Sequence, residues 1–223
     1  MADLPSWPRP HFSDAGNDGH IFYVAFLDQV PVEWAISGSK YRCSGIPDGI
    51  DVMGYGPDSH PDVVDGFREG AIWDQVASQV PALTNAIANA PSCVLLRGAL
   101  KDRETLDDHR NLVGVLQWLC DQGAVAILDL TAITWWSAED WRAKAFAPAA
   151  AVPHAHVVIL NSESPDQTRW LHTRGMIKYG RPDISVRGVP TQAETDAARL
   201  INRFIELMAL GGNVTDGAAI RVD

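Results

Sequence analysis

The chain has 223 residues, of which 46% are hydrophobic, and a formal net charge of -10. This length can bury a core without a disulfide or a structural metal, and the acidic excess argues against general nucleic-acid binding, because phosphate contacts need surplus lysine and arginine. The three cysteines lack disulfide-framework or zinc-site spacing, and no signal peptide or long apolar run is present, so we expect a cytoplasmic protein without a membrane partner.

The first third of the chain predicts an arm, two strands and two helices. Residues 1–19 are rich in Pro, Gly, Asp and Ser, and we expect a flexible, poorly ordered arm there. The β-branched and aromatic run 20–27 predicts a buried strand, and a second strand is expected near 50–55. Apolar residues then recur at helical spacing over 61–89, where Pro81 is expected to begin a second helix.

The middle of the chain predicts a strand, a helix and a strand. Residues 92–98 and 124–130 are apolar runs typical of buried strands. Between them, Thr105 and Asp108 have the spacing of a capping box, and an amphipathic helix follows as far as Gly123. If the two strands pair in parallel, their crossover should be right-handed.

The C-terminal third predicts a hairpin and a long helix. Ser137 is placed to cap a short helix. The later elements are expected as strands at 155–160, 168–173 and 183–189, a helix beginning at Thr191 or Gln192, and a terminal strand at 219–222. The first two of these strands should pair as a hairpin.

This mixture of elements predicts an α+β fold with a mixed, largely antiparallel sheet and packed helices. We expect a single domain over 20–223. Two ferredoxin-like, split β-α-β halves at 20–130 and 154–223 fit the order of elements, although no internal sequence repeat supports them.

Positive charge gathers near one segment of this acidic chain. The candidate anion- or partner-binding residues are His172, Arg174, Lys178, Arg181 and Asp183. Arginine forms bidentate hydrogen bonds with carboxylates and phosphates, so the segment predicts a site that faces outward toward an anion or a partner. The alternative is a strand and a tight turn whose cations pair with the protein's own carboxylates.

Tryptophans form a second candidate surface, made of Trp135, Trp136, Trp141 and Trp170. Adjacent residues of a strand point to opposite faces, so one of Trp135 and Trp136 is expected to be buried and the other exposed. These side chains would either anchor a protein partner or cover the end of the sheet.

Metal and cofactor sites have little support in the sequence. His154 and His156 would share a face if they lay in a strand, with His172 as a conceivable third ligand. No established metal-binding spacing includes them, so we expect no metal. Nucleophile-elbow and phosphate-loop motifs are missing, so we expect no cofactor and no catalytic residue.

The stretch LHTRGMIKYGRPDISV resembles a TxGMxx[FY]GxP[DE] segment of a family of uncharacterised bacterial cytoplasmic proteins. The matching residues are Thr173, Gly175, Met176, Tyr179, Gly180, Pro182 and Asp183. The resemblance extends over about 92–223. It implies an α+β fold and no particular activity, because the family is a domain of unknown function.

These features favour a non-catalytic protein-binding module with a regulatory or immunity-like role, and the acidic charge favours a basic partner. The alternative is an enzyme or small-molecule-binding protein that holds an anionic ligand at 172–183, with His172 as acid or base. A homo-oligomer that buries Trp135 or Trp136 across a two-fold axis is a third hypothesis.

Overall fold

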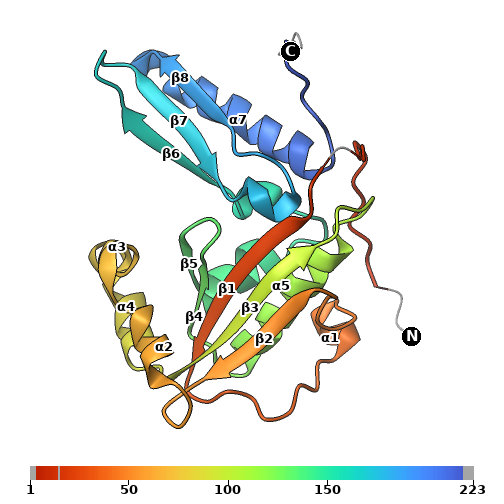
Figure 1. Ribbon diagram of the computed structural model, residues 1–223, viewed down its shortest axis with the longest axis vertical. Coiled ribbons are helices and arrows are strands. Elements are labelled where there is room, and N and C mark those ends of the chain that lie inside the picture. Colours follow the sequence, from red (N-terminus) through yellow and green to blue (C-terminus); the bar gives the residue numbers. More distant parts are fainter. Residues whose placement is uncertain (1–3, 15, 218–223) are drawn as a thin grey trace.

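The computed structural model describes residues 4–14 and 16–217 and confirms the α+β class. Figure 1 shows a five-stranded sheet and a separate three-stranded sheet, each with its own helices, and every strand pairing in both is antiparallel. Among the described residues, no helix combines the length and the apolar character that crossing a bilayer would require.

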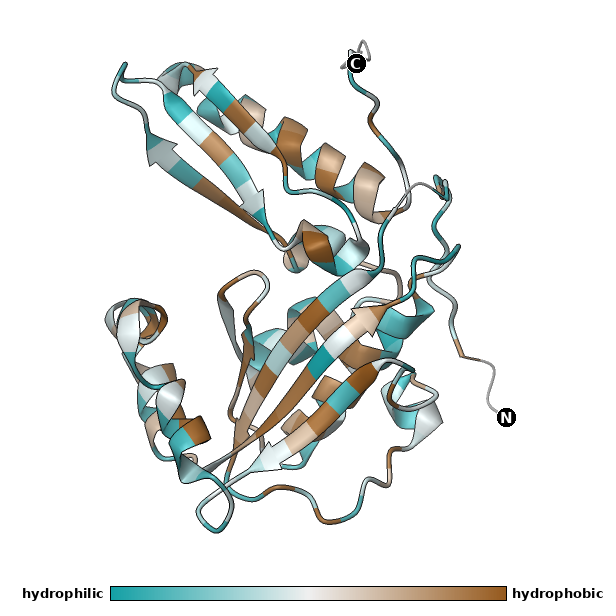
Figure 2. Cartoon of the chain, in the orientation of Figure 1, coloured by the Kyte–Doolittle hydropathy of each residue, from teal (hydrophilic) through white to brown (hydrophobic). Residues whose placement is uncertain are grey.

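The five-stranded sheet is built around β1 (Gly19–Leu27), the apolar run that predicted a buried strand. Its strands lie in the order β2 (Ile50–Tyr55), β3 (Ser92–Leu100), β1, β4 (Ala126–Asp129) and β5 (Thr134–Ser137). Because side chains alternate along a strand, Tyr23 of β1 enters one hydrophobic core while Val24 and Phe26 enter another on the opposite face. Figure 2 shows the resulting hydrophobic bands along β1 and β3.

Helices cover both faces of this sheet. The first face packs against α5 (Asp107–Asp121) and against a π-helical turn at Trp141–Phe146. This turn directly follows the short α6 (Ala138–Asp140). The second face packs against α2 (Pro61–Gly66), α3 (Gly70–Gln79) and α4 (Pro81–Ala88). The short α1 (Gly38–Tyr41) contacts α5.

β3, α5 and β4 form a split β-α-β unit. β1 lies between β3 and β4 and pairs antiparallel with both, so these two strands run parallel without pairing directly. The first predicted half, 20–130, therefore contains the expected motif.

The second half is built differently. Its sheet is a simple meander of β6 (Val158–Glu163), β7 (Arg169–Arg174) and β8 (Ser185–Val189), followed by α7 (Glu194–Ala209). The hairpin prediction is confirmed, but the described residues of this half form no split β-α-β unit, which corrects the expected second ferredoxin-like half. The terminal strand expected at 219–222 falls outside the described residues.

Two predicted helix caps have different outcomes. The Ser137 hydroxyl accepts a hydrogen bond from the Asp140 backbone N–H at 3.0 Å, as expected. The Thr105 capping box is wrong, because α5 begins after Leu106 without a side-chain cap. The Asp107 carboxylate instead accepts the backbone N–H of Trp7 at 2.7 Å, so a distant segment uses the start of this helix.

The described part of the predicted arm is packed against the domain. Trp7 is 4% exposed, and Pro8 forms an antiparallel bridge with Thr105. The backbone of His11 donates to Leu210 O, just beyond α7. Residues 4–14 therefore contact both halves of the molecule, contrary to the expectation of a poorly ordered arm.

Candidate functional site

The predicted cationic segment lies where the two sheets meet. After β7, the chain forms a 3-10 turn at Met176–Tyr179 that contacts β1. Gly175 and Gly180 flank this turn with φ values of 116° and 66°, a region that favours glycine. Met176 is fully buried, so the turn enters the core. The segment therefore connects the two sheets.

Lys178 extends from this turn into the interior. Its ammonium group forms an ion pair with Asp129 at the end of β4, and both side chains are 0% exposed. The other carboxylate oxygen of Asp129 accepts the backbone N–H groups of Thr131 and Ala132. Burial lowers the pKa of Lys178, while Asp129 opposes that shift. The prediction that Lys178 binds an external anion is therefore wrong, because its partner is an internal carboxylate.

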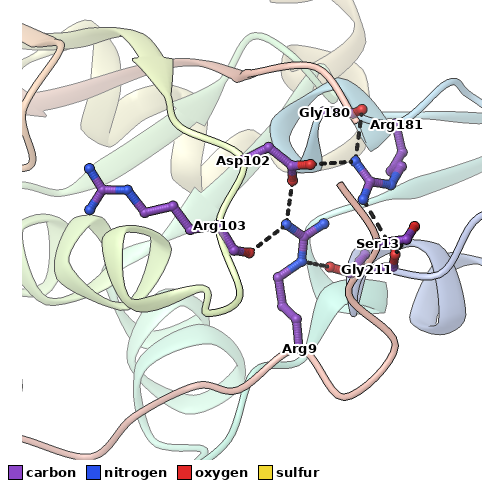
Figure 3. Close-up of polar contacts among 8 residues, drawn as sticks. Arg9, Ser13, Asp102, Arg103, Gly180, Arg181 and Gly211 are labelled. Carbon is purple, nitrogen blue, oxygen red and sulfur yellow. Dashed lines mark hydrogen bonds and ion pairs between the residues drawn. The ribbon is translucent and has the colours of Figure 1, made fainter. Parts of the chain in front are cut away.

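Arg181 is committed in a similar way (Figure 3). Its Nη1 lies 3.3 Å from Asp102, and its side chain is 4% exposed. Arg9 reaches the other oxygen of the same carboxylate and also donates to Ala209 O at 3.0 Å. Asp102 thus joins the N-terminal segment, the end of β3 and the connecting turn, and Arg181 does not face outward as expected.

Asp183 has a local structural role. One of its oxygens accepts hydrogen bonds from Thr173 Oγ1 at 2.9 Å and from the backbone N–H of Met176 at 3.2 Å. The Thr173 hydroxyl accepts the Ile184 N–H at 2.8 Å. These three hydrogen bonds fix the path of the chain between β7 and β8. They give a structural reason for a threonine at one end of the segment and an acidic residue at the other.

A small cavity lies beside the junction of the two sheets, which is the region around the connecting turn Met176–Tyr179. Its lining includes Trp7, Tyr23, His109, His156 and Tyr179. Its volume of about 10 Å³ is close to the room that one water molecule needs, which is too small for a substrate. Burial is the main cause that lowers the pKa of His109 and of His156 to about 3, so both rings are neutral at physiological pH.

The histidine pair considered for a metal is not in a strand. Pro153 begins a 3-10 turn that contains His154, which is exposed, whereas His156 is buried and packs against Trp136. The two rings therefore do not share a strand face. The described residues contain no group of three or more His, Cys, Asp or Glu side chains arranged to hold a metal ion.

Three of the four candidate tryptophans belong to the protein's own cores. Trp141 is fully buried, and Trp136 is 6% exposed in the same core. Trp135 points to the opposite face, as predicted, but it is not exposed as expected, because it packs there against Phe26 and Trp73. Trp170 differs, because it belongs to neither core.

Trp170 lies on the face of the three-stranded sheet that turns away from α7. On β7, Leu171 and Thr173 are buried toward α7, so Trp170, His172 and Arg174 point to the other side. Strand register and the stacking of Arg187 define this open face as Val158, Leu160, Ser162, Trp170, His172, Arg174, Ser185 and Arg187. In Figure 1, α7 lies along one side of the sheet, and no other helix or strand of the described chain covers the opposite side.

The centre of the open face is a stack of three side chains. The rings of Trp170 and His172 are 4.2 Å apart at an interplanar angle of 22°. The Arg187 guanidinium lies 4.6 Å from the centroid of the Trp170 ring, and the indole N–H donates to Ser185 Oγ at 2.9 Å. These contacts hold the indole in one orientation while leaving it at the surface.

The structure thus divides the predicted site residues into two groups. Lys178, Arg181 and Asp183 hold the junction, whereas His172 and Arg174 lie with Trp170 on the open face. Three further members of the open face, Val158, Leu160 and Arg187, were not among the predicted site residues. The alternation in 168–174 together with the expected hairpin contained a signal for Val158 and Leu160, but the irregular register between β7 and β8 hid Arg187.

Comparisons with protein-family models, with curated proteins and with solved structures give no match to this chain. The resemblance of Thr173–Asp183 to an uncharacterised bacterial family remains a prediction.

Proposed function

We propose that this protein is a non-catalytic binding module that recognises a protein partner through the open face of β6, β7 and β8. The observation that carries this proposal is that Val158, Leu160 and Trp170 are apolar, partly exposed and part of neither core. A tryptophan held in place by its neighbours is a common anchor in protein interfaces, because little side-chain entropy is lost when it becomes covered.

The alternative of an enzyme or small-molecule-binding protein has less support. It required His172, Arg174 and Arg181 to converge on one cavity, but Arg181 is bound to Asp102 at the junction. Two small cavities lie at the junction, one lined mainly by aromatic and aliphatic side chains and one that includes Arg9, Asp102 and Lys178 in its lining, and each has room for about one water molecule. The oligomer that would bury Trp135 or Trp136 between subunits also loses support, because each of them packs against a core of its own subunit.

The state of the cysteines is consistent with the cytoplasmic location that we propose. All three are free, and Cys43 and Cys93 are buried. Burial raises the pKa of Cys93 and of Cys120 to about 12, so these thiols are poor nucleophiles. This fits a reducing compartment and a protein without cysteine chemistry.

Site-specific photocrosslinking in the cells that make this protein tests the proposal. A benzophenone amino acid replaces Ser162, which is exposed on the open face, and the matched control carries it at Arg203, which is exposed on α7. We expect one protein adduct from position 162, none from position 203, and loss of the adduct when Trp170→Ala is added. The purified partner should then bind at least tenfold more weakly to the Trp170→Ala variant.

Three outcomes would contradict the proposal. They are the absence of an adduct from position 162, an adduct that persists in the Trp170→Ala variant, and an adduct formed only with a second copy of this chain. Because Trp170 packs in neither core, its replacement should leave the thermal unfolding temperature nearly unchanged, and this measurement separates lost binding from lost folding.

A further inference from the structure

The two faces of the three-stranded sheet differ in how their cations are neutralised. On the side toward α7, Arg169 lies 3.6 Å from Glu163 and 3.5 Å from Glu194. On the open face, Arg174 and Arg187 make no ion pair with any described residue, although most lysines and arginines of the chain do. In a chain of net charge -10, carboxylates are plentiful, so two unpaired arginines on one uncovered face are a local feature.

The two arginines lie at opposite ends of an apolar and aromatic strip. Arg187 stacks on Trp170, whereas Arg174 is four residues farther along β7 and points to the same side. At a rise of about 3.3 Å per residue, the two cationic ends are separated by roughly 13 Å. Leu160 pairs with His172 between them, so the middle of the strip is apolar and aromatic.

We infer that the open face binds an acidic segment of a partner protein in an extended conformation, with carboxylates that meet Arg174 and Arg187 and an apolar side chain between them. An extended chain places residues i, i+2 and i+4 on one side over roughly 13 Å, which matches the spacing of the two arginines. The segment therefore has the pattern acidic, any residue, apolar, any residue, acidic. This inference rests on the proposed function and specifies its partner.

The charge distribution favours an acidic protein segment over a nucleic acid. Each arginine can form a bidentate pair with one carboxylate, so two carboxylates neutralise the pair of arginines. A nucleic acid would bring many more phosphates than this face can neutralise, close to a molecule that is strongly negative overall. The net charge of the chain favours a basic partner, whereas the arginines of the open face favour an acidic segment. The local charge decides at this surface, because the contact is made there.

NMR titration of the isotope-labelled full chain tests the inference. The probe is a peptide of threonines that carries two glutamates four positions apart with a leucine midway, and the controls replace both glutamates with glutamine or with lysine. An oligodeoxythymidylate is the nucleic-acid arm. We expect the glutamate peptide to shift the Trp170 indole N–H and the amides of β6–β8 at millimolar concentration, more strongly at low than at high ionic strength.

Arginine variants identify the charged contacts. Arg187→Gln and Arg174→Gln should each weaken binding of the glutamate peptide by about tenfold. Arg203→Gln is the matched control, because Arg203 is also exposed and makes no ion pair with the described residues, and its affinity should equal that of the wild type. Equal shifts with the glutamine peptide, tighter binding of the lysine peptide or the oligonucleotide, or an unchanged affinity in both variants would overturn the inference.

The two tests can fail separately. If crosslinking from position 162 identifies a partner whose contact segment is not acidic, the proposed function stands and the inference about the segment is wrong. If no adduct forms and the glutamate peptide causes no shift, both are wrong.

Discussion

Lys178 shows how one buried charge determines the role of its neighbours. Its side chain and that of Asp129 are fully buried, and neither could be left ionised in this environment without the other. The sequence could not indicate this pairing, because Asp129 lies 49 residues away from Lys178. The residues around Lys178 in the sequence do not distinguish a buried lysine from an exposed one. The alternation in β7 did place Trp170, His172 and Arg174 on one face, so the part of the site that depends on local pattern was predictable.

Removal of the Lys178 charge should strongly destabilise the protein. Lys178→Met leaves the Asp129 carboxylate buried without a cation, and we expect a loss of about 3–5 kcal/mol in the free energy of unfolding, measured by urea denaturation. Adding Asp129→Asn removes the unpaired charge while keeping an oxygen for the turn at Thr131 and Ala132, so the double variant should be more stable than Lys178→Met alone.

An exposed ion pair provides the control for this experiment. Lys144, whose side chain is 64% exposed, pairs with Asp140, and Lys144→Met should cost no more than about 1 kcal/mol. A double variant no more stable than Lys178→Met would show that the lysine contributes through packing and not through its charge.

At the scale of elements, strands were predicted well where apolar residues alternate or run together, as in β1, β3 and β7. The errors came from competing local chemistry. Pro153 began a 3-10 turn that includes His154 and extends into the start of the strand expected at 155–160, and Asp107 bonded to Trp7 where a capping box was expected. Periodicity identifies an element, but its ends depend on contacts that are distant in sequence.

Two glycines with the same backbone angle allow a direct test of the junction. Gly180 and Gly188 both have φ of 66°, so alanine at either position should cost about 1–2 kcal/mol from the left-handed conformation alone. A Cβ at Gly180 would lie 1.7 Å from Asn17 O, whereas a Cβ at Gly188 has no atom within 4 Å among the described residues. Gly180→Ala should therefore reduce the free energy of unfolding much more than Gly188→Ala.

Chemical denaturation of the two variants measures this difference. Similar losses for Gly180→Ala and Gly188→Ala would mean that the backbone around Asn17 can move aside, so that the turn is less tightly held against the N-terminal segment than its contacts indicate.

At the scale of the whole molecule, one continuous core spans both sheets. It includes Leu116 of α5, Leu171 of β7 and Ile201 of α7. The sequence predicted the α+β class but not this arrangement, because the insertion of β1 between β3 and β4 and the contacts of Trp7 and Arg9 are long-range. Such long-range contacts produce no hydrophobic periodicity in the sequence from which they could be predicted.

The histidines of the junction predict how the stability of the whole molecule depends on pH. His109 and His156 have pKa values of about 3 in the folded protein, against an ordinary value of 6.5. Below pH 6.5 the unfolded chain takes up protons that the folded protein does not, so the free energy of unfolding should fall as the pH is lowered from 6.5 toward 3.

Urea denaturation between pH 7 and pH 5 measures this effect before most carboxylates begin to titrate. We expect His109→Phe to reduce the slope, because the phenylalanine ring takes up no proton in the unfolded chain and can still stack on Tyr179. A free energy of unfolding that is constant between pH 7 and pH 5 would contradict the prediction.

The junction also affects how sequence similarity should be interpreted among proteins that carry the pattern from Thr173 to Asp183. The pattern from Thr173 to Asp183 describes how one sheet is attached to another. Proteins grouped by that pattern would share the way in which their two sheets are joined. The partner that each one binds would depend on positions 170, 172 and 174, which the pattern leaves unspecified.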